Sequence, residues 1–173
     1  MKNCLCRAHR QVRSNGFTLM ELLIVMAIIA ILMLIAIPTV GSLKKKANEM
    51  SAQKSVQTII SAQNMFESNY PTSGFSCSLT ALGGDPKIGA PSATAAQLIQ
   101  PDLASGFKSG YIFNISNCSK VNAGGSDRIT GYNITATPQT VGSTGDRAFC
   151  SDQSGIIKFD PAGGSNCSQT LGQ

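Results

Sequence analysis

The chain has 173 residues and a mass of 18.1 kDa, which leaves room for one modest domain. The formal charge is +5, but most of it comes from the first 16 residues, which contain Lys2, Arg7, Arg10 and Arg13 and no acidic residue. From Phe17 onward there are ten Lys and Arg and nine Asp and Glu, so the charge does not indicate a nucleic-acid binder. The single histidine, His9, also lies there, and the lack of histidine downstream argues against an enzyme or a zinc site, so we predict no catalytic residue, metal or cofactor.

An apolar run follows the basic leader, residues 1–16, without a break. Of the 24 residues from Phe17 to Val40, only four are not apolar: Thr18, Glu21, Pro38 and Thr39. A helix of about 20 apolar residues crosses a bilayer. A secretory signal peptide is the competing interpretation, but its apolar region spans roughly 7–15 residues and ends at a small-x-small site. This run instead continues into a lysine cluster at 44–46, so we predict a transmembrane half-helix over 17–42.

The helical pattern continues beyond the apolar run. One set of residues recurs at three- and four-residue steps with polar residues between them, and all of its members except Gln63 are apolar or aromatic: Ala52, Val56, Ile59, Ile60, Gln63, Phe66 and Tyr70. One long helix with an amphipathic second half is therefore predicted. Pro38 is expected to kink it by removing a backbone donor, and Tyr70-Pro71 is expected to end it.

The rest of the chain predicts a connector and then a sheet. Residues 71–109 are rich in Gly, Pro, Ser, Thr and Ala, with one short helix expected around Ala93–Ile99. Alternating faces downstream predict strands at Tyr111–Ile115 and Tyr132–Ala136. Two more strands, Arg147–Cys150 and Ile156–Phe159, flank a polar turn.

These elements together predict an α+β fold. A four-stranded antiparallel sheet packed against the amphipathic half of the helix buries both apolar faces at once. We therefore expect three parts: a leader over 1–16 that is removed, a transmembrane half-helix over 17–42, and a disulfide-bonded head over 43–173 that includes the amphipathic half-helix.

The six cysteines fall into two groups, a leader pair, Cys4 and Cys6, and four far downstream. The downstream set has no CxxC spacing, which predicts two disulfides in an oxidising compartment instead of a metal site. Four cysteines allow three connectivities. We choose Cys150–Cys167, which closes the terminal hairpin, and Cys77–Cys118, which ties the connector to the first strand. Cys4 and Cys6 are expected to stay unpaired with the head.

A short motif sits directly against the apolar run. Residues 13–21 read Arg-Ser-Asn-Gly-Phe-Thr-Leu-Met-Glu. This segment closely resembles the processing site of type IV prepilins and type II secretion pseudopilins, in which the leader ends in Gly, Phe follows, and Glu is the fifth residue after the cut. Gly16, Phe17 and Glu21 occupy those positions, and Pro38 lies where the family commonly carries a proline. The resemblance covers residues 16–70 well and the head only in its general layout.

The resemblance implies a pilin-like fold and a structural role. A prepilin peptidase would cut between Gly16 and Phe17, and the new amine of Phe17 would be methylated. The chain would sit in the inner membrane with a cytoplasmic N-terminus and a periplasmic head, and inner-membrane machinery would then assemble copies into a periplasmic or extracellular fibre. Glu21 would meet the amine of a neighbouring copy, since a carboxylate in a membrane helix needs a partner.

The sequence and its resemblance to prepilins leave three candidate functions. The first is a subunit of a type IV pilus. The second is a major or minor pseudopilin of a type II secretion system, because the Asn69–Thr72 segment resembles the end of the long helix in major pseudopilins. The third, from a different class, is a membrane-tethered binding domain that never polymerises. That class predicts a cluster of chemically competent residues in the head, and the scattered carboxylates and missing histidine argue against it.

Overall fold

The computed structural model describes residues 16–123 and 125–171, apart from the side chains of residues 35–39, 123 and 126. The chain divides into two compact units, Met1–Thr39 and Val40–Gln173. Helix α1, Leu19–Asn69, contributes to both units. Its last residue agrees with the end predicted at Tyr70-Pro71. Its bounds include Pro38, whose side chain lies outside the described set, so the predicted kink at Pro38 stays a prediction.

The second unit contains a six-stranded antiparallel sheet with strand order β1-β2-β3-β4-β5-β6. The strands are β1 Phe107–Lys108, β2 Tyr111–Ala123, β3 Ser126–Pro138, β4 Ala148–Asp152, β5 Lys158–Asp160 and β6 Gln169–Thr170. The prediction of an α+β fold with an antiparallel sheet is confirmed, but the predicted count of four strands is wrong. β1 and β6 are two residues long, too short to show an alternating pattern in the sequence.

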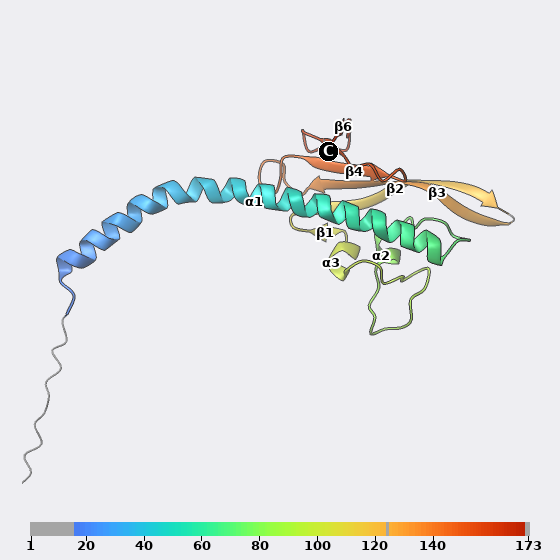
Figure 1. Ribbon diagram of the computed structural model, residues 1–173, viewed down its shortest axis with the longest axis horizontal. Helices are drawn as coiled ribbons and strands as arrows, with labels where there is room; N and C mark the ends of the chain where they lie inside the picture. The colour runs from blue at the N-terminus through green and yellow to red at the C-terminus, as the bar shows by residue number, and fades with distance from the viewer. Residues whose placement is uncertain (1–15, 124, 172–173) are drawn as a thin grey trace, which may run out of the picture. The chain divides into compact units, whose positions relative to one another are not determined.

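The core of the second unit lies between the sheet and α1 (Figure 1). The helix contributes the predicted stripe, with Ala52, Val56, Ile59 and Phe66 all buried. The facing side of the sheet contributes buried residues at alternate positions of β2 and β3 and one on β4: Tyr111, Phe113, Ile115, Tyr132, Ile134, Ala136 and Phe149. The apolar side chains of the helix and those of the strands thus pack together in one core layer.

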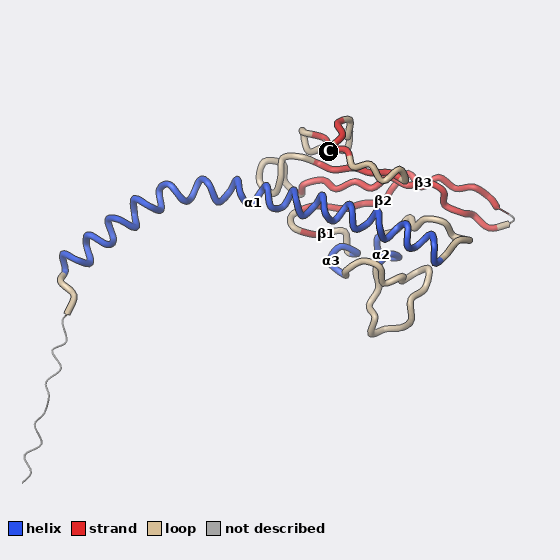
Figure 2. Tube along the Cα trace, in the orientation of Figure 1, coloured by secondary structure: helices blue, strands red, loops and turns tan. Residues whose placement is uncertain are grey.

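β2 and β3 extend well past the rest of the sheet as a two-stranded ribbon (Figure 2). β4 pairs with β3 only between Asn133 and Ala136, whereas β2 and β3 stay paired as far as Ala123 and Ser126. The register shifts twice between Ser116 and Lys120, with one extra residue first on β2 and then on β3. The sequence predicted only the inner parts of both strands, because most residues of the ribbon are polar and show no regular apolar alternation.

The connector between α1 and β1 contains two short helices, α2 Leu79–Leu82 and α3 Pro101–Ala104. The helix predicted over Ala93–Ile99 is wrong. In that segment the amides of Ala96 and Leu98 donate to the carbonyls of Ala81 and Leu82, at 2.8 Å each. Irregular backbone that pairs with the end of α2 therefore replaces the local helix, and it still buries Ala96 and Ile99.

Two disulfides join segments of the second unit that are far apart in sequence. Cys77 in the connector bonds to Cys118 on β2, and Cys150 on β4 bonds to Cys167 near the C-terminus. These are the two pairs chosen from the sequence. The first attaches the connector beside the bend in β2, and the second holds the last described segment against the sheet.

A buried glutamine fixes the connector to the helix. Gln63 is fully buried within the apolar stripe, and its side-chain amide pairs twice with the backbone of Ser76. Its Nε2 donates to the Ser76 carbonyl at 2.7 Å, and its Oε1 accepts from the Ser76 amide at 2.8 Å. The side-chain amide of Gln63 and the backbone of Ser76 thus hydrogen-bond to each other where water does not reach them. This pairing fixes the position of the chain next to Cys77.

A polar clamp joins α1 to the loop before β4. Glu49 is buried, and its Oε1 accepts from the backbone amides of Asp146 at 2.9 Å and Arg147 at 3.2 Å. Its Oε2 accepts from Nε and Nη2 of Arg147 at 2.9 and 2.7 Å. The guanidinium also lies 5.9 and 5.6 Å from the ring centroids of Phe149 and Phe159. A carboxylate with four donors satisfies the conditions under which a buried charge is tolerated.

The two disulfides give a first testable prediction. Loop-closure entropy grows slowly with loop length, so the pair of separation 41 is expected to stabilise the head by about 4 kcal/mol and the pair of separation 17 by about 3 kcal/mol. Double Cys→Ala variants of each pair should lower the free energy of unfolding by these amounts in denaturant titrations. Non-reducing peptide mapping is the control, and a peptide linking Cys77 to Cys150 contradicts the assignment.

The clamp gives a second prediction. Glu49→Ala removes the acceptor of two backbone amides and of a guanidinium, so the free energy of unfolding should fall by about 3 kcal/mol. Glu67→Ala is the matched control, because Glu67 also pairs with an arginine, Arg128, at 2.6 Å, but both side chains are about one third exposed. The control should lose less than about 1 kcal/mol. Equal losses would contradict the role given to Glu49.

The pH dependence of stability provides a further check on the clamp. Burial acts to raise the pKa of Glu49, but the hydrogen bonds from Asp146 and Arg147 outweigh it and hold the pKa below its usual value. A carboxyl with a lower pKa in the folded state stabilises the fold above the unfolded pKa, roughly 4.3, and loses that contribution as the pH falls through the folded pKa. Glu49→Gln should therefore lose less stability than the natural chain on acidification below about pH 4.5.

Candidate functional site

The first described residues lie in an accessible stretch ahead of α1. Gly16 and Phe17 precede the helix and are exposed, with Phe17 at 88%. A side-chain carbon built on Gly16 would meet no atom within 4 Å, so the backbone there is open on that side. The structure thus leaves the Gly16–Phe17 peptide bond free of packing by the described residues, as cleavage by another protein requires.

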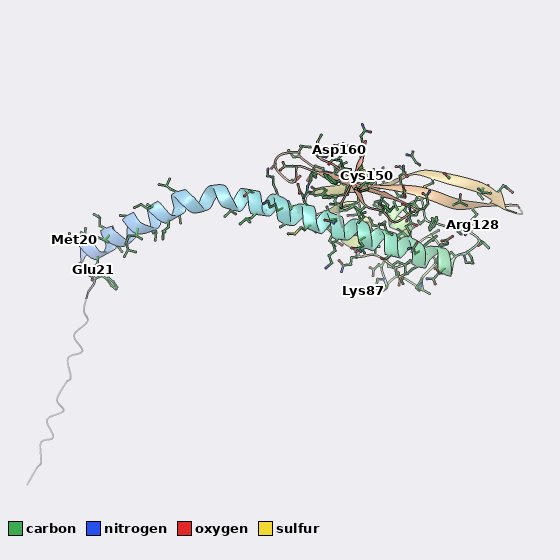
Figure 3. The ribbon with its side chains drawn as sticks, turned by 45° about the horizontal axis from the view of Figure 1, so that its top comes forward. Met20, Glu21, Lys87, Arg128, Cys150 and Asp160 are labelled. Carbon is green, nitrogen blue, oxygen red and sulfur yellow. A yellow bond between two sulfur atoms is a disulfide. The ribbon has the colours of Figure 1, made fainter. Side chains whose placement is uncertain are left out.

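Thr18 and Glu21 form a reciprocal cap at the start of α1. The amide and Oγ1 of Thr18 each donate to Oε2 of Glu21 at 3.0 Å, and the amide of Glu21 donates to Oγ1 of Thr18 at 3.2 Å. This is a capping box, in which the residue before the helix and the third helical residue satisfy each other's amides. Figure 3 shows Glu21 in the first turn of α1, next to Met20.

The capping box adds a partner for Glu21 that the sequence did not lead us to expect. The resemblance assigns to Glu21 the amine of a neighbouring copy, but Thr18 is a partner within the chain. The spacing Thr-x-x-Glu before an apolar run was a readable sign of it. The hydrogen bonds that the described residues make to this carboxylate all end on Oε2, so Oε1 remains open to a donor from outside the chain.

The helix that follows is apolar on every side. The large apolar side chains from Phe17 to Leu34 are all exposed, with fractions from 42% at Ile29 to 88% at Phe17. A helix that is hydrophobic all round is stable in water only when other surfaces cover it. Among the described residues, no helix is both long and apolar enough to cross a bilayer, so the transmembrane segment predicted over 17–42 is not confirmed.

Acidic side chains of the head serve local turns. Asp152 Oδ1 accepts from the amide of Ser154 at 2.8 Å, and Asp160 Oδ1 accepts from the amide of Ala162 at 2.9 Å. Hydrogen bonds from the side chain and amide of Ser154 lower the pKa of Asp152. Within the described ranges, no three or more His, Cys, Asp or Glu side chains gather closely enough to hold a metal ion.

One comparison with known proteins bears on this site. Residues 12–37 match the family described as the prokaryotic N-terminal methylation motif, the signature of the prepilin-type segment of type IV pilins and pseudopilins. The match includes Gly16, Phe17 and Glu21, and it ends just before Pro38. No curated protein and no solved structure matches the chain.

Proposed function

We propose that this chain is a structural subunit of a type IV pilus, made as a precursor and assembled into a helical fibre. The match of residues 12–37 to the methylation motif carries the proposal, since the motif implies both processing and assembly. The open Gly16–Phe17 bond and the uncovered apolar helix behind it support the proposal, because a fibre core of packed helices would cover those side chains.

Processing comes first in this proposal. The basic leader stays on the cytoplasmic side of the inner membrane, and the residues from Phe17 to Val40 lie in the bilayer until assembly. A prepilin peptidase hydrolyses the Gly16–Phe17 bond, which removes the four cations of the leader and leaves an amine on Phe17. That amine is then methylated, and it keeps its positive charge as a secondary ammonium group.

Assembly then depends on Glu21. Its Oε2 accepts hydrogen bonds from Thr18, while Oε1, to which no described residue donates, receives the ammonium group of Phe17 from a neighbouring copy. A charge in an apolar surrounding is costly unless it is paired. Helices packed in a wrong register would leave the carboxylate and the ammonium group unpaired, and that cost exceeds the stability gained in the correct register. Thr18 acts as a positioning residue, because it fixes the rotamer of Glu21 before the neighbour arrives.

A pseudopilin of a type II secretion system is the second candidate. It is supported by the Asn69-Tyr70-Pro71-Thr72 sequence, which resembles the corresponding segment of major pseudopilins and lies at the end of α1. Both candidates share the processing and assembly steps. They differ in the machinery encoded beside the gene, where a retraction ATPase indicates a pilus and a secretion cluster indicates a pseudopilus.

Processing gives the third prediction. Intact-mass analysis of membrane-extracted protein should show 157 residues, the full 173 minus 16, with a methylated Phe17 at the new N-terminus. Gly16→Leu should block the cut because the peptidase site loses its open glycine, whereas Ser14→Leu, two residues upstream, should leave the mass of the product unchanged. A mature chain that still carries Arg13 contradicts the proposal.

Assembly gives the fourth prediction. Glu21→Leu should insert, be cleaved and fold its head, yet yield few sheared fibres relative to membrane-bound subunit. Glu21→Gln should be nearly as defective if the charge itself is required. Thr18→Val loses the hydroxyl and about 1 kcal/mol of helix capping, so its fibre yield should fall to an intermediate level. Thr18→Ser, which keeps the cap, is the matched control.

Natural fibre yield from Glu21→Leu would overturn the assembly role and favour the third class, a tethered domain that does not polymerise. Equal yields from Thr18→Val and Thr18→Ser would leave Glu21 in its role but remove Thr18 from it.

A further inference from the structure

A pocket of about 310 Å³ lies in the head between α1 and the end of the connector. One wall consists of four residues of α1, namely Ser51, Lys54, Ser55 and Thr58, of which Lys54 and Thr58 are exposed. The opposite wall consists of Leu98, Ile99, Gln100, Leu103 and Lys108, which belong to the segment around α3 and β1 (Figure 1). Its volume falls at the lower end of the range of small-molecule sites.

The floor of the pocket is apolar. Ile99 and Leu103 are buried and belong to the hydrophobic core, and Leu98 packs against the same core. These side chains come from the irregular segment that pairs with α2 and from α3, so backbone hydrogen bonds fix their positions. A bound molecule would therefore meet a preformed apolar surface at this end.

Two polar groups of the pocket lack partners. Ser55 is only 5% exposed, yet nothing in the described part of the chain hydrogen-bonds to its hydroxyl. The exposed ammonium group of Lys54 likewise has no ion-pair or hydrogen-bond partner among the described residues. No fully buried side-chain oxygen or nitrogen among the described residues is left without a hydrogen bond, so the Ser55 hydroxyl is one that solvent reaches through the pocket, and it is accessible to a bound molecule.

The remaining polar groups already have partners and define the rim. Thr58 donates to the Lys54 carbonyl at 3.0 Å, and Ser51 lies 2.9 Å from Ser109, hydroxyl to hydroxyl. Lys108 pairs with Asp102 at 3.2 Å and lies 3.4 Å from Oε1 of Gln100. The charges of Lys108 and Asp102 cancel, which leaves one net positive charge, that of Lys54.

We propose that this pocket binds a small monocarboxylate whose apolar group is short. The carboxylate would accept from the Lys54 ammonium and the Ser55 hydroxyl, and its apolar group would rest on Leu98, Ile99 and Leu103. One net positive charge fits a singly charged anion, and the apolar floor disfavours a fully polar ion such as phosphate. The inference does not depend on fibre assembly, because every lining residue belongs to the head.

The test uses the purified full chain in nonionic detergent, with hexanoate as the probe. Its neutral isostere, hexanamide, is the matched ligand control, since it has the same apolar group without the charge. Hexanoate is expected to shift the methyl NMR signals of Leu98, Ile99 and Leu103 in a saturable way, and hexanamide is expected to bind about tenfold more weakly.

Variants locate the site. Lys54→Met, at an exposed helix position, should weaken hexanoate binding about tenfold, and Ser55→Ala should weaken it about threefold. Lys120→Met is the matched control, because Lys120 is an exposed lysine on the β2–β3 ribbon, remote from the pocket lining, and should leave the affinity unchanged. Denaturant titrations of each variant verify the fold.

The proposal is overturned if hexanoate shifts no signal, if hexanamide binds equally well, or if Lys54→Met binds like the natural chain while remaining folded. Each of these results would mean that the cavity is a packing gap of the head.

Discussion

Helix α1 carries apolar side chains in two settings, and only one of them is covered by the chain itself. Between Ala52 and Phe66 the stripe packs on the sheet, so the hydrophobic effect that holds the head together acts within one molecule. Between Phe17 and Leu34 the apolar side chains point in all directions and stay exposed. The described residues leave these side chains exposed, so covering them would release further free energy, and the proposed fibre provides a covering surface in neighbouring copies.

In the proposed assembly, the second half of α1 has to keep its position in the head while the first half packs against neighbouring copies. Two buried polar side chains hold α1 in place in the second unit. Glu49 joins α1 to the loop before β4, and Gln63 joins it to Ser76. Because each needs a specific partner, a shift of α1 by one turn would leave both side chains unpaired, a penalty that the apolar stripe alone does not impose. The pair of Glu67 with Arg128 is about one third exposed and adds less.

Much of this arrangement could be predicted from local patterns. The helical stripe, the inner parts of β2 and β3, the end of α1 at Tyr70-Pro71 and the two cysteine pairs were all accessible, because periodicity and turn residues report on burial. The failures came from interactions distant in sequence. Ala93–Ile99 has a helical pattern, but its backbone hydrogen-bonds to the end of α2. β1 and β6 are strands only because they hydrogen-bond to the edge of a neighbouring strand. Nothing local marks Ser76 as the partner of Gln63 or Arg147 as that of Glu49.

Thr18 and Glu21 cap the start of α1, and the carboxylate that serves in this cap is the same group to which we assign a role in assembly. At the start of any helix the first amides lack partners, and an acidic residue in the third position satisfies one of them. Under the proposed assembly, this capping geometry also holds the carboxylate in one rotamer, with Oε2 used and Oε1 open. In the proposed assembly, cleavage at Gly16 adds a cation at Phe17. When Oε1 of Glu21 pairs with that cation on a neighbouring copy, the hydrogen bonds from Thr18 to Oε2 stay in place. The capping geometry and the proposed contact between copies therefore use different oxygens of the same carboxylate and are compatible.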